Sequence, residues 1–183
     1  AGYLLSCMTE GRTGDEAASR MERIRAIVSE AGATETKSSI PRVMRANPFP
    51  EVSGLLTPTG KRINWLHTVV PNSRAVECFN ETEALYDRHQ ADMERHGIAR
   101  GYFLTTNGPS GVGIETLINW SDAPLPIHRH YMKAAGDYAT KPADPAAREM
   151  VATITRAIIR RWSEMGAVHL QIGRKYPYLE TRE

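Results

Sequence analysis

The segment 99–120 contains the pattern that most constrains the fold of this chain. Two strand-like stretches, residues 99–106 and 112–120, flank Asn107-Gly108-Pro109-Ser110-Gly111, a run of turn-forming residues. The residues of the second stretch that should share one face are Val112, Ile114, Thr116, Ile118 and Trp120. Such alternation is typical of a strand with one covered face. The segment therefore predicts an antiparallel hairpin in a sheet that is packed on one side.

Three longer segments carry apolar residues at the spacing of an amphipathic helix. They cover residues 15–31, 74–96 and 145–165, and each is followed by a glycine that can end a helix. Asp144-Pro145 gives the last segment a cap residue and a proline at its first helical position. We expect all three helices to lie on one face of the sheet, with their apolar stripes in the core.

The remaining patterns are shorter. Residues 3–8 and 63–70 are expected to form strands, and residues 57–60 a hairpin turn between residues 54–56 and the second of these strands. Proline-rich residues 34–50 are expected to form a loop. A short helix is expected over residues 127–138.

These patterns follow one another as strand, helix, strands, helix, strands, short helix, long helix and strand. Helices with one apolar stripe must cover a sheet, and hairpins favour antiparallel pairing. We therefore predict an α+β fold with an antiparallel sheet, helices packed on one face, and the ferredoxin-like split βαβ arrangement. We expect residues 1–183 to form a single domain. Because the sequence begins inside a strand-like run and stops just after a turn, we also expect it to be a piece of a longer polypeptide.

Charge and composition argue against several classes of function. A net charge of +2 predicts no strong attraction to nucleic acid or to a membrane surface. No apolar run is long enough to span a bilayer. Cys7 and Cys78 are too few for a disulfide framework, which favours a cytoplasmic location.

The common signatures of catalytic and cofactor sites are weak or missing. His128-Arg129-His130 offers two ligands, whereas protein metal sites usually take three or four at defined spacings, so no metal is predicted. Gly108, Gly111 and Gly113 are not followed by the helix pattern that a phosphate-binding loop requires. We also find no nucleophile elbow, no redox cysteine pair and no dinucleotide fingerprint.

The most suggestive polar residues follow the long helix, in the segment 165–178. His169 comes shortly after Gly166, and Arg174, Lys175 and Tyr176 follow it. A histidine beside two cations and phenol groups could orient an anionic substrate and handle its proton. The same residues also suit a last strand with a core histidine and a solvated turn. The residues alone leave both interpretations open.

Three groups of motifs together carry a resemblance to a known family. They are Asn119-Trp120-Ser121-Asp122-Ala123-Pro124 leading to His128-Arg129, the long helix after Asp144-Pro145, and His169-Leu170-Gln171-Ile172-Gly173-Arg174 with Tyr176-Pro177-Tyr178. With these motifs the chain resembles the C-terminal, substrate-side domain of FAD-linked oxidases of the glycolate oxidase and D-lactate dehydrogenase type. These enzymes belong to the vanillyl-alcohol oxidase and p-cresol methylhydroxylase flavoprotein superfamily.

The resemblance implies a cofactor, a partner and a reaction. FAD would be bound mainly by a separate N-terminal FAD-binding domain, and the sheet of this domain would cover the flavin ring and form the substrate pocket. The parent enzyme would oxidise an alcohol carbon, as in a 2-hydroxy acid such as lactate or glycolate, by hydride transfer to the flavin.

The resemblance also implies roles for individual residues. His169 would be the catalytic base, since its usual pKa lies near neutrality. Arg174 and Tyr176 would complete the catalytic group. The small-molecule alcohol substrate would be bound by Arg45, Trp120 and Arg129.

One departure from the family leaves alternatives open. Metal-dependent members carry a His-x-Gly-Asp-Gly-Asn-x-His segment, where this chain has residues 105–111 without either histidine. An enzyme of the same superfamily that oxidises a phenolic alcohol without metal is therefore an alternative. A non-catalytic ferredoxin-like module for binding or assembly, including a homodimer, is another.

Strand alternation predicts where His169 lies. If Val168 faces the helices, His169 must face the opposite, uncovered side of the sheet. We expect its strand to lie beside the strand of Trp120, with Trp120 and Tyr176 forming an exposed patch around the imidazole. A buried His169 on the helix side would instead favour the structural interpretation.

Overall fold

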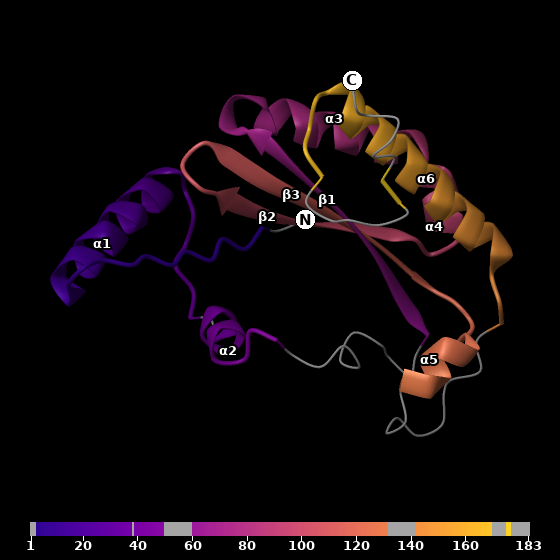
Figure 1. Ribbon diagram of the computed structural model, residues 1–183, viewed down its shortest axis with the longest axis horizontal. Helices are drawn as coiled ribbons and strands as arrows, with labels where there is room; N and C mark the ends of the chain where they lie inside the picture. Colours follow the sequence, from indigo (N-terminus) through magenta and orange to yellow (C-terminus); the bar gives the residue numbers. More distant parts are fainter. Residues whose placement is uncertain (1–2, 38, 50–59, 132–141, 170–174, 177–183) are drawn as a thin grey trace. The chain divides into compact units, whose positions relative to one another are not determined.

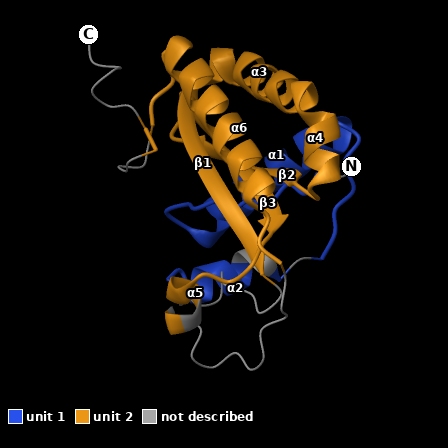
Figure 2. Ribbon diagram, turned by 90° about the vertical axis from the view of Figure 1, so that its right-hand side faces the viewer, with its two compact units in different colours: residues 1–51 blue, residues 52–183 orange. Residues whose placement is uncertain are grey.

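The computed structural model describes residues 3–37, 39–49, 60–131, 142–169 and 175–176. The chain divides into two compact units, Ala1–Glu51 and Val52–Glu183 (Figure 2). The expectation of a single domain stays a prediction, and each unit is described here by itself.

The secondary structure differs between the two units. The first contains the helices α1 (Gly14–Glu30) and α2 (Ile40–Ala46). The second contains, in chain order, β1 (Lys61–Pro71), the 3-10 turn η2 (Asn72–Arg74), α3 (Ala75–Arg88), α4 (Gln90–Arg95), β2 (Ala99–Asn107), β3 (Gly111–Ser121), α5 (Pro126–Tyr131) and α6 (Pro145–Glu164) (Figure 1).

The first unit confirms the predicted helix 15–31 but not its burial. The hydroxyl of Thr13 caps α1 by accepting from the backbone N–H of Glu16, and Gly32 follows the helix with φ of +81°. No residue of α1 is buried, so the prediction that its apolar stripe belongs to the core is wrong. The stripe is only half-covered because its own unit offers the short helix α2 and extended chain as packing partners.

Two further predictions in the first unit are wrong. Residues 3–8 form no strand, and Tyr3 is 83% exposed. A strand needs a neighbour for its backbone hydrogen bonds, and the described part of this unit contains no other strand. The expected loop 34–50 contains α2, which starts with Pro41 in its first turn, where a missing N–H costs nothing.

The second unit confirms the antiparallel α+β prediction. Its sheet has the order β1-β3-β2, and β3 pairs antiparallel with both neighbours. Strands β1 and β2 are therefore parallel to each other, with α3 and α4 connecting them and β3 inserted between them. This is the split βαβ arrangement. An isolated bridge joins Val168 to Val69 on the free edge of β1, where the chain returns after α6.

Helices α3 and α6 pack side by side on one face of this sheet (Figures 1 and 2). The largest fully buried side chains between the layers include Leu66, Tyr86, Ile118, Ile158 and Trp162. Polar groups within the core bond to one another. The Trp162 indole donates to the Thr82 hydroxyl at 2.9 Å, and the hydroxyls of Tyr86 and Thr116 lie 2.7 Å apart.

The helices of the second unit begin and end near the predicted residues, except that one predicted helix is divided in two. The predicted helix 74–96 is divided at His89 into α3 and α4. Helix α6 begins as predicted, because the Asp144 carboxylate accepts from the N–H of Ala147 at 2.8 Å, and Gly166 follows it with φ of +70°. Helix α5 confirms the start of the predicted helix 127–138. The remainder of that helix and residues 50–59, with most of the predicted 57–60 turn, lie outside the described residues.

Asp122 anchors the end of β3 to the start of α6. Its carboxylate is almost fully buried and accepts from Arg148 and from the backbone N–H groups of Ala123 and Asp144 at 2.7 and 3.1 Å. The hydrogen bond from Arg148 is the largest of the effects that lower the pKa of Asp122 to about 2. Gly60, at φ of +75°, approaches so closely that a Cβ there would lie 2.5 Å from the Asp122 carbonyl oxygen.

Candidate functional site

The structure brings together two of the predicted site residues, His169 and Tyr176. Their ring centroids are 4.4 Å apart. The His169 Nε2 lies 3.3 Å from the hydroxyl of Ser163 on α6, and the Tyr176 hydroxyl accepts the backbone N–H of His67 at 3.0 Å. Burial is the main cause that lowers the pKa of His169, while a hydrogen bond to the backbone of His67 acts in the opposite direction. Both side chains therefore hold the free edge of β1.

The predicted orientation of His169 is wrong. Val168 is 63% exposed, and the half-buried imidazole of His169 faces α6. The strand it joins is β1 rather than the Trp120 strand β3. The prediction assumed that the apolar Val168 would take the covered side, but Val168 sits at the sheet edge, beyond the helices' cover. Alternation then turns His169 toward Ser163.

The remaining predicted residues stand differently. Trp120 packs against the core rather than forming an exposed patch, although its buried Nε1 has no hydrogen-bond partner there. Arg45 is an exposed side chain of the first unit, 3.4 Å from Glu10. The side chain of Arg129 and the whole of Arg174 lie outside the described structure. Their assigned roles stay predictions.

A different group of residues lies on the face of the sheet opposite α3 and α6. Alternate residues of β1 point to the helices, as shown by Asn64, which donates to Thr155 of α6 at 2.7 Å. The residues between them must point the other way. We call this second side of the sheet the open face. Its larger side chains include Ile63, Trp65, His67, Phe103, Glu115 and Leu117, and alternation places Val69, Gly101, Thr105, Gly113 and Asn119 on the same side.

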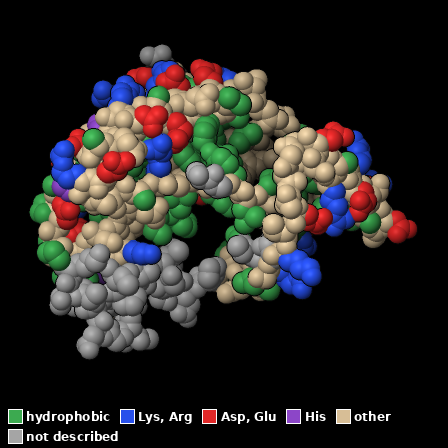
Figure 3. Space-filling view, turned by 180° about the vertical axis from the view of Figure 1, so that it is seen from behind, with side chains coloured by type: hydrophobic (Ala, Val, Ile, Leu, Met, Phe, Trp, Pro, Cys, Tyr) green, Lys and Arg blue, Asp and Glu red, His purple; other side chains and the backbone are tan. Residues whose placement is uncertain are grey.

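The open face is largely apolar and aromatic. Trp65 is 36% exposed and lies opposite Leu117, and Phe103 is 49% exposed and lies opposite Glu115. Figure 3 shows hydrophobic side chains gathered in one part of the view, with most charged side chains to either side of it. Neighbouring exposed apolar side chains such as Ile63, Trp65 and Phe103 are typical of a contact with a ligand or another domain.

His67 and Glu115 lie against each other in the middle of the open face. They are direct cross-strand partners, and the His67 Nδ1 lies 3.2 Å from Oε1 of Glu115. The imidazole is only 8% exposed, and the Trp65 ring lies 6.4 Å from it, centroid to centroid. The second nitrogen, Nε2, is buried and has no hydrogen-bond partner among the described residues. A buried polar atom without a partner is uncommon and calls for a ligand or an ordered water.

Sequence reasoning missed His67 and Glu115. The available signal was the run Ile63-Asn64-Trp65-Leu66-His67. Large apolar side chains occur on both faces of this strand, Ile63 and Trp65 on one and Leu66 on the other, so both faces could be covered. Glu115 stands out within the alternating residues 112–120 as a carboxylate that must lie on the other face. Pairing the two required the register of β1 against β3, which the sequence does not specify.

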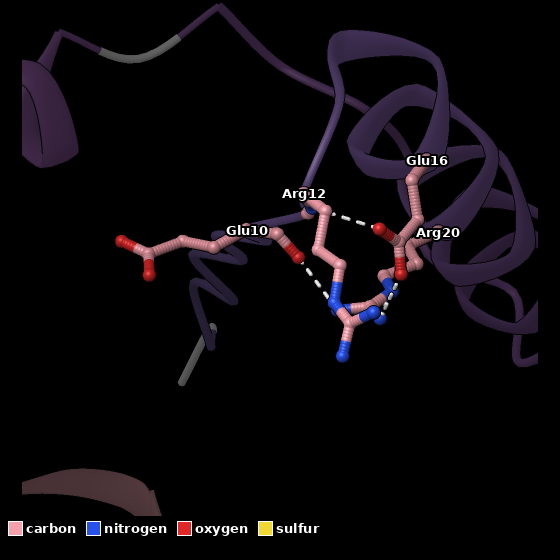
Figure 4. Close-up of a pocket in the computed structure, with 5 residues that line it drawn as sticks. Glu10, Arg12, Glu16 and Arg20 are labelled. Atoms are coloured by element: carbon pink, nitrogen blue, oxygen red, sulfur yellow. Dashed lines mark hydrogen bonds and ion pairs between the residues drawn. The ribbon is translucent and has the colours of Figure 1, made fainter.

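The first unit contains a shallow depression of about 360 Å³ lined by Glu10, Gly11, Arg12, Glu16 and Arg20 (Figure 4). Its charged groups bond to one another: Arg20 pairs with Glu16 and donates to the Glu10 carbonyl at 2.6 Å, and Glu16 accepts the N–H of Arg12 at 2.7 Å. These contacts are exposed and hold the start of α1. They do not form a site with unsatisfied buried groups.

No family model matches the chain, and no match is found among curated proteins or solved structures. Across the described residues, no cluster of three or more histidine, cysteine or acidic side chains is arranged to hold a metal ion. None of the helices in this part of the chain has the length and apolar character needed to cross a membrane.

Proposed function

We propose that this chain is the substrate-side domain of an FAD-dependent oxidoreductase that oxidises an alcohol carbon of a small molecule. The observation that carries the proposal is the open face, where the aromatic side chains of Trp65 and Phe103 lie near the buried imidazole of His67 and the partly buried carboxylate of Glu115. The helices cover the opposite side of the sheet. A cofactor or substrate held by another domain would lie on the open side.

The residues of the open face fit the flavin ring system and its substrate. Trp65, Phe103 and Leu117 offer flat apolar area to a planar ring. The unpartnered Nε2 of His67 offers an acceptor to a hydroxyl group. The pyrophosphate and adenine would be held mainly by an N-terminal FAD-binding domain, the partner that we propose for this face. When bound, the flavin supplies the oxidant, because its N5 accepts the hydride of the alcohol carbon.

The side chains of the open face favour a phenolic alcohol over a 2-hydroxy acid as the substrate. The described open face carries two aromatic side chains and the acidic Glu115. An aryl substrate would stack on the aromatic side chains, whereas a substrate carboxylate would need a cation such as Arg174, Arg129 or Arg45. Both free thiols, Cys7 and Cys78, agree with the cytoplasmic location that we propose.

The test uses the complete gene product from which this sequence comes. We expect it to purify with FAD and to show bleaching of the flavin absorbance when mixed anaerobically with one member of an alcohol panel. The panel contains lactate, glycolate, benzyl alcohol and 4-hydroxybenzyl alcohol. A matched pair of variants locates the reaction: Leu117→Arg on the open face should slow bleaching, while Arg156→Glu on the solvent side of α6 should not.

Two outcomes would overturn the proposal. A gene product with neither bound FAD nor an FAD-binding segment would favour the non-catalytic binding or assembly module. A flavoprotein in which Leu117→Arg and Arg156→Glu bleach at equal rates would remove the open face from the reaction.

A further inference from the structure

We infer that His67 is the proton acceptor of the proposed oxidation and that Glu115 is the residue that positions it. This inference rests on the proposed function and assigns the base that the reaction requires. It moves that role from His169, at the edge of the sheet, to the centre of the open face.

The contact with Glu115 favours one tautomer of His67. The Nδ1 lies 3.2 Å from the Glu115 carboxylate, and an ionised carboxylate can only accept a hydrogen bond. A hydrogen on Nδ1 would point toward this carboxylate, and the lone pair of the neutral ring would then lie on Nε2. Nε2 is buried and has no hydrogen-bond partner among the described residues. In this tautomer Nε2 is the atom that would accept the proton of the alcohol.

The backbone of His67 is held in place from the outer edge of β1. The Tyr176 hydroxyl accepts the His67 N–H, and His169 bonds to the backbone of the same residue. At this point two side chains replace the pairing that a further strand would provide. The predicted residues His169 and Tyr176 thus act as positioning residues for the strand that carries His67.

The two histidines differ in where they lie. The His169 ring contacts the Tyr176 ring at an interplanar angle of 36° and lies against Ser163 on the helix side. The Ser163 hydroxyl also donates to the carbonyl of Ile159 at 3.0 Å, so this contact belongs to the packing of α6. His67 lies on the other face of the sheet, beside the Trp65 ring, where we expect a substrate ring to bind.

His67 would take the proton that the alcohol loses. The alcohol O–H would transfer this proton to Nε2 of His67 while the C–O bond becomes a carbonyl, and the hydride of the same carbon, with its two electrons, would go to the flavin held by the FAD-binding domain. His67 then carries a positive charge opposite the Glu115 carboxylate. In other enzymes a carboxylate likewise orients a catalytic imidazole and stabilises the imidazolium that forms when the imidazole takes up a proton.

The first experiment measures the tautomer in this chain, without flavin. Long-range 15N–1H correlation spectra of the labelled chain distinguish protonated from unprotonated ring nitrogens. We expect Nδ1 of His67 to be protonated and Nε2 unprotonated at neutral pH, with an exchanging mixture in Glu115→Ala. A His67 that carries its proton on Nε2 would overturn the inference whatever reaction the parent protein performs.

The second experiment measures flavin reduction in the complete gene product with its best alcohol. His67→Asn should lower the rate constant about 10²- to 10⁴-fold, the usual contribution of a general base. Glu115→Ala should lower it about tenfold or more and change its pH profile, while Glu115→Asp should recover part of the loss. The matched control is His89→Asn at the α3–α4 junction, which should keep the wild-type rate. Equal rates for His67→Asn and wild type would remove His67 from the mechanism.

The two experiments separate the inference from the proposed function. If no alcohol reduces the flavin, the proposed function fails while the tautomer is still measured. If an alcohol reduces the flavin but His67→Asn is as fast as wild type, the function stands and the base is another group.

Discussion

The two faces of the sheet β1-β3-β2 are made from alternate residues of the same strands, yet they differ in how their polar groups are satisfied. On the helix side Asn64 bonds to Thr155, and Thr116 bonds to Tyr86, although the buried Nε1 of Trp120 has no described partner. On the open face the closest polar groups are His67 and Glu115, and the buried Nε2 of His67 has no described partner. Side-chain hydrogen bonds therefore connect the strands to the helices on one face, whereas the polar pair of the other face retains an unused acceptor or donor. Sites that break a local rule in this way are often functional.

The largest expected effect is a difference in unfolding free energy between variants of two adjacent residues of β3. Ile118 is fully buried under the helices, while its neighbour Leu117 lies half-buried on the open face. Ile118→Ala should lower the free energy of unfolding by about 2–5 kcal/mol through lost burial and a cavity. Leu117→Ala should lower it by about 1 kcal/mol. Urea unfolding measures both, and equal losses would show that the open face is covered as well as the helix side.

The second effect concerns Asp122, which ties β3 to the helix layer. Its pKa is lowered from 3.8 to about 2, so the carboxylate stabilises the folded chain above pH 4 and loses this contribution as the pH falls toward 2. Asp122→Asn should therefore cost roughly 2 kcal/mol at neutral pH. The difference between variant and wild type should shrink as unfolding is measured from pH 4 down to pH 2. A difference that is constant with pH would mean that Asp122 acts by packing alone.

A third prediction tests the cost of the polar pair on the open face. The double variant with His67→Leu and Glu115→Leu removes the pair and its unpartnered nitrogen. It should be as stable as wild type or more stable by about 1 kcal/mol. Thr116→Val on the helix side should instead destabilise by about 1 kcal/mol, because it leaves the buried Tyr86 hydroxyl without its partner. Thermal unfolding compares the two, and a strongly destabilised double variant would assign the pair a structural role.

The smallest effect belongs to the edge of β1. Ser163→Ala removes the 3.3 Å contact to His169 and should cost about 0.5 kcal/mol in urea unfolding. In the complete gene product we expect flavin reduction to stay close to wild type. A loss as large as that of His67→Asn would return the role of base to His169.

Much of the fold could be predicted from local patterns. The hairpin Asn107–Gly111 and the helix after Asp144 follow from turn residues and capping, which act over a few residues. Residues 3–8 show the limit of this approach, because an apolar run predicts a strand only where a neighbouring strand is present to pair with it.

The candidate site was less accessible from the sequence. His169 was identified as polar and unusual, but its orientation depends on which side of β1 the chain joins and on how far α6 extends over it. His67 and Glu115 are 48 positions apart and meet only through the β1–β3 register. Registers of non-neighbouring strands are set by tertiary packing, which single-residue patterns do not encode.

The most direct test of the open face as the flavin side measures its accessibility with and without the rest of the protein. Phe103→Cys places a thiol on the open face, and Arg160→Cys places one on the exposed surface of α6 as a control. In this chain alone both thiols should react readily with a maleimide. In the flavin-loaded gene product, labelling at position 103 should slow by about tenfold or more, because it would require local opening of a covered surface. Labelling at position 160 should not change. Equal labelling at position 103 in both forms would contradict the assignment of this face to the flavin.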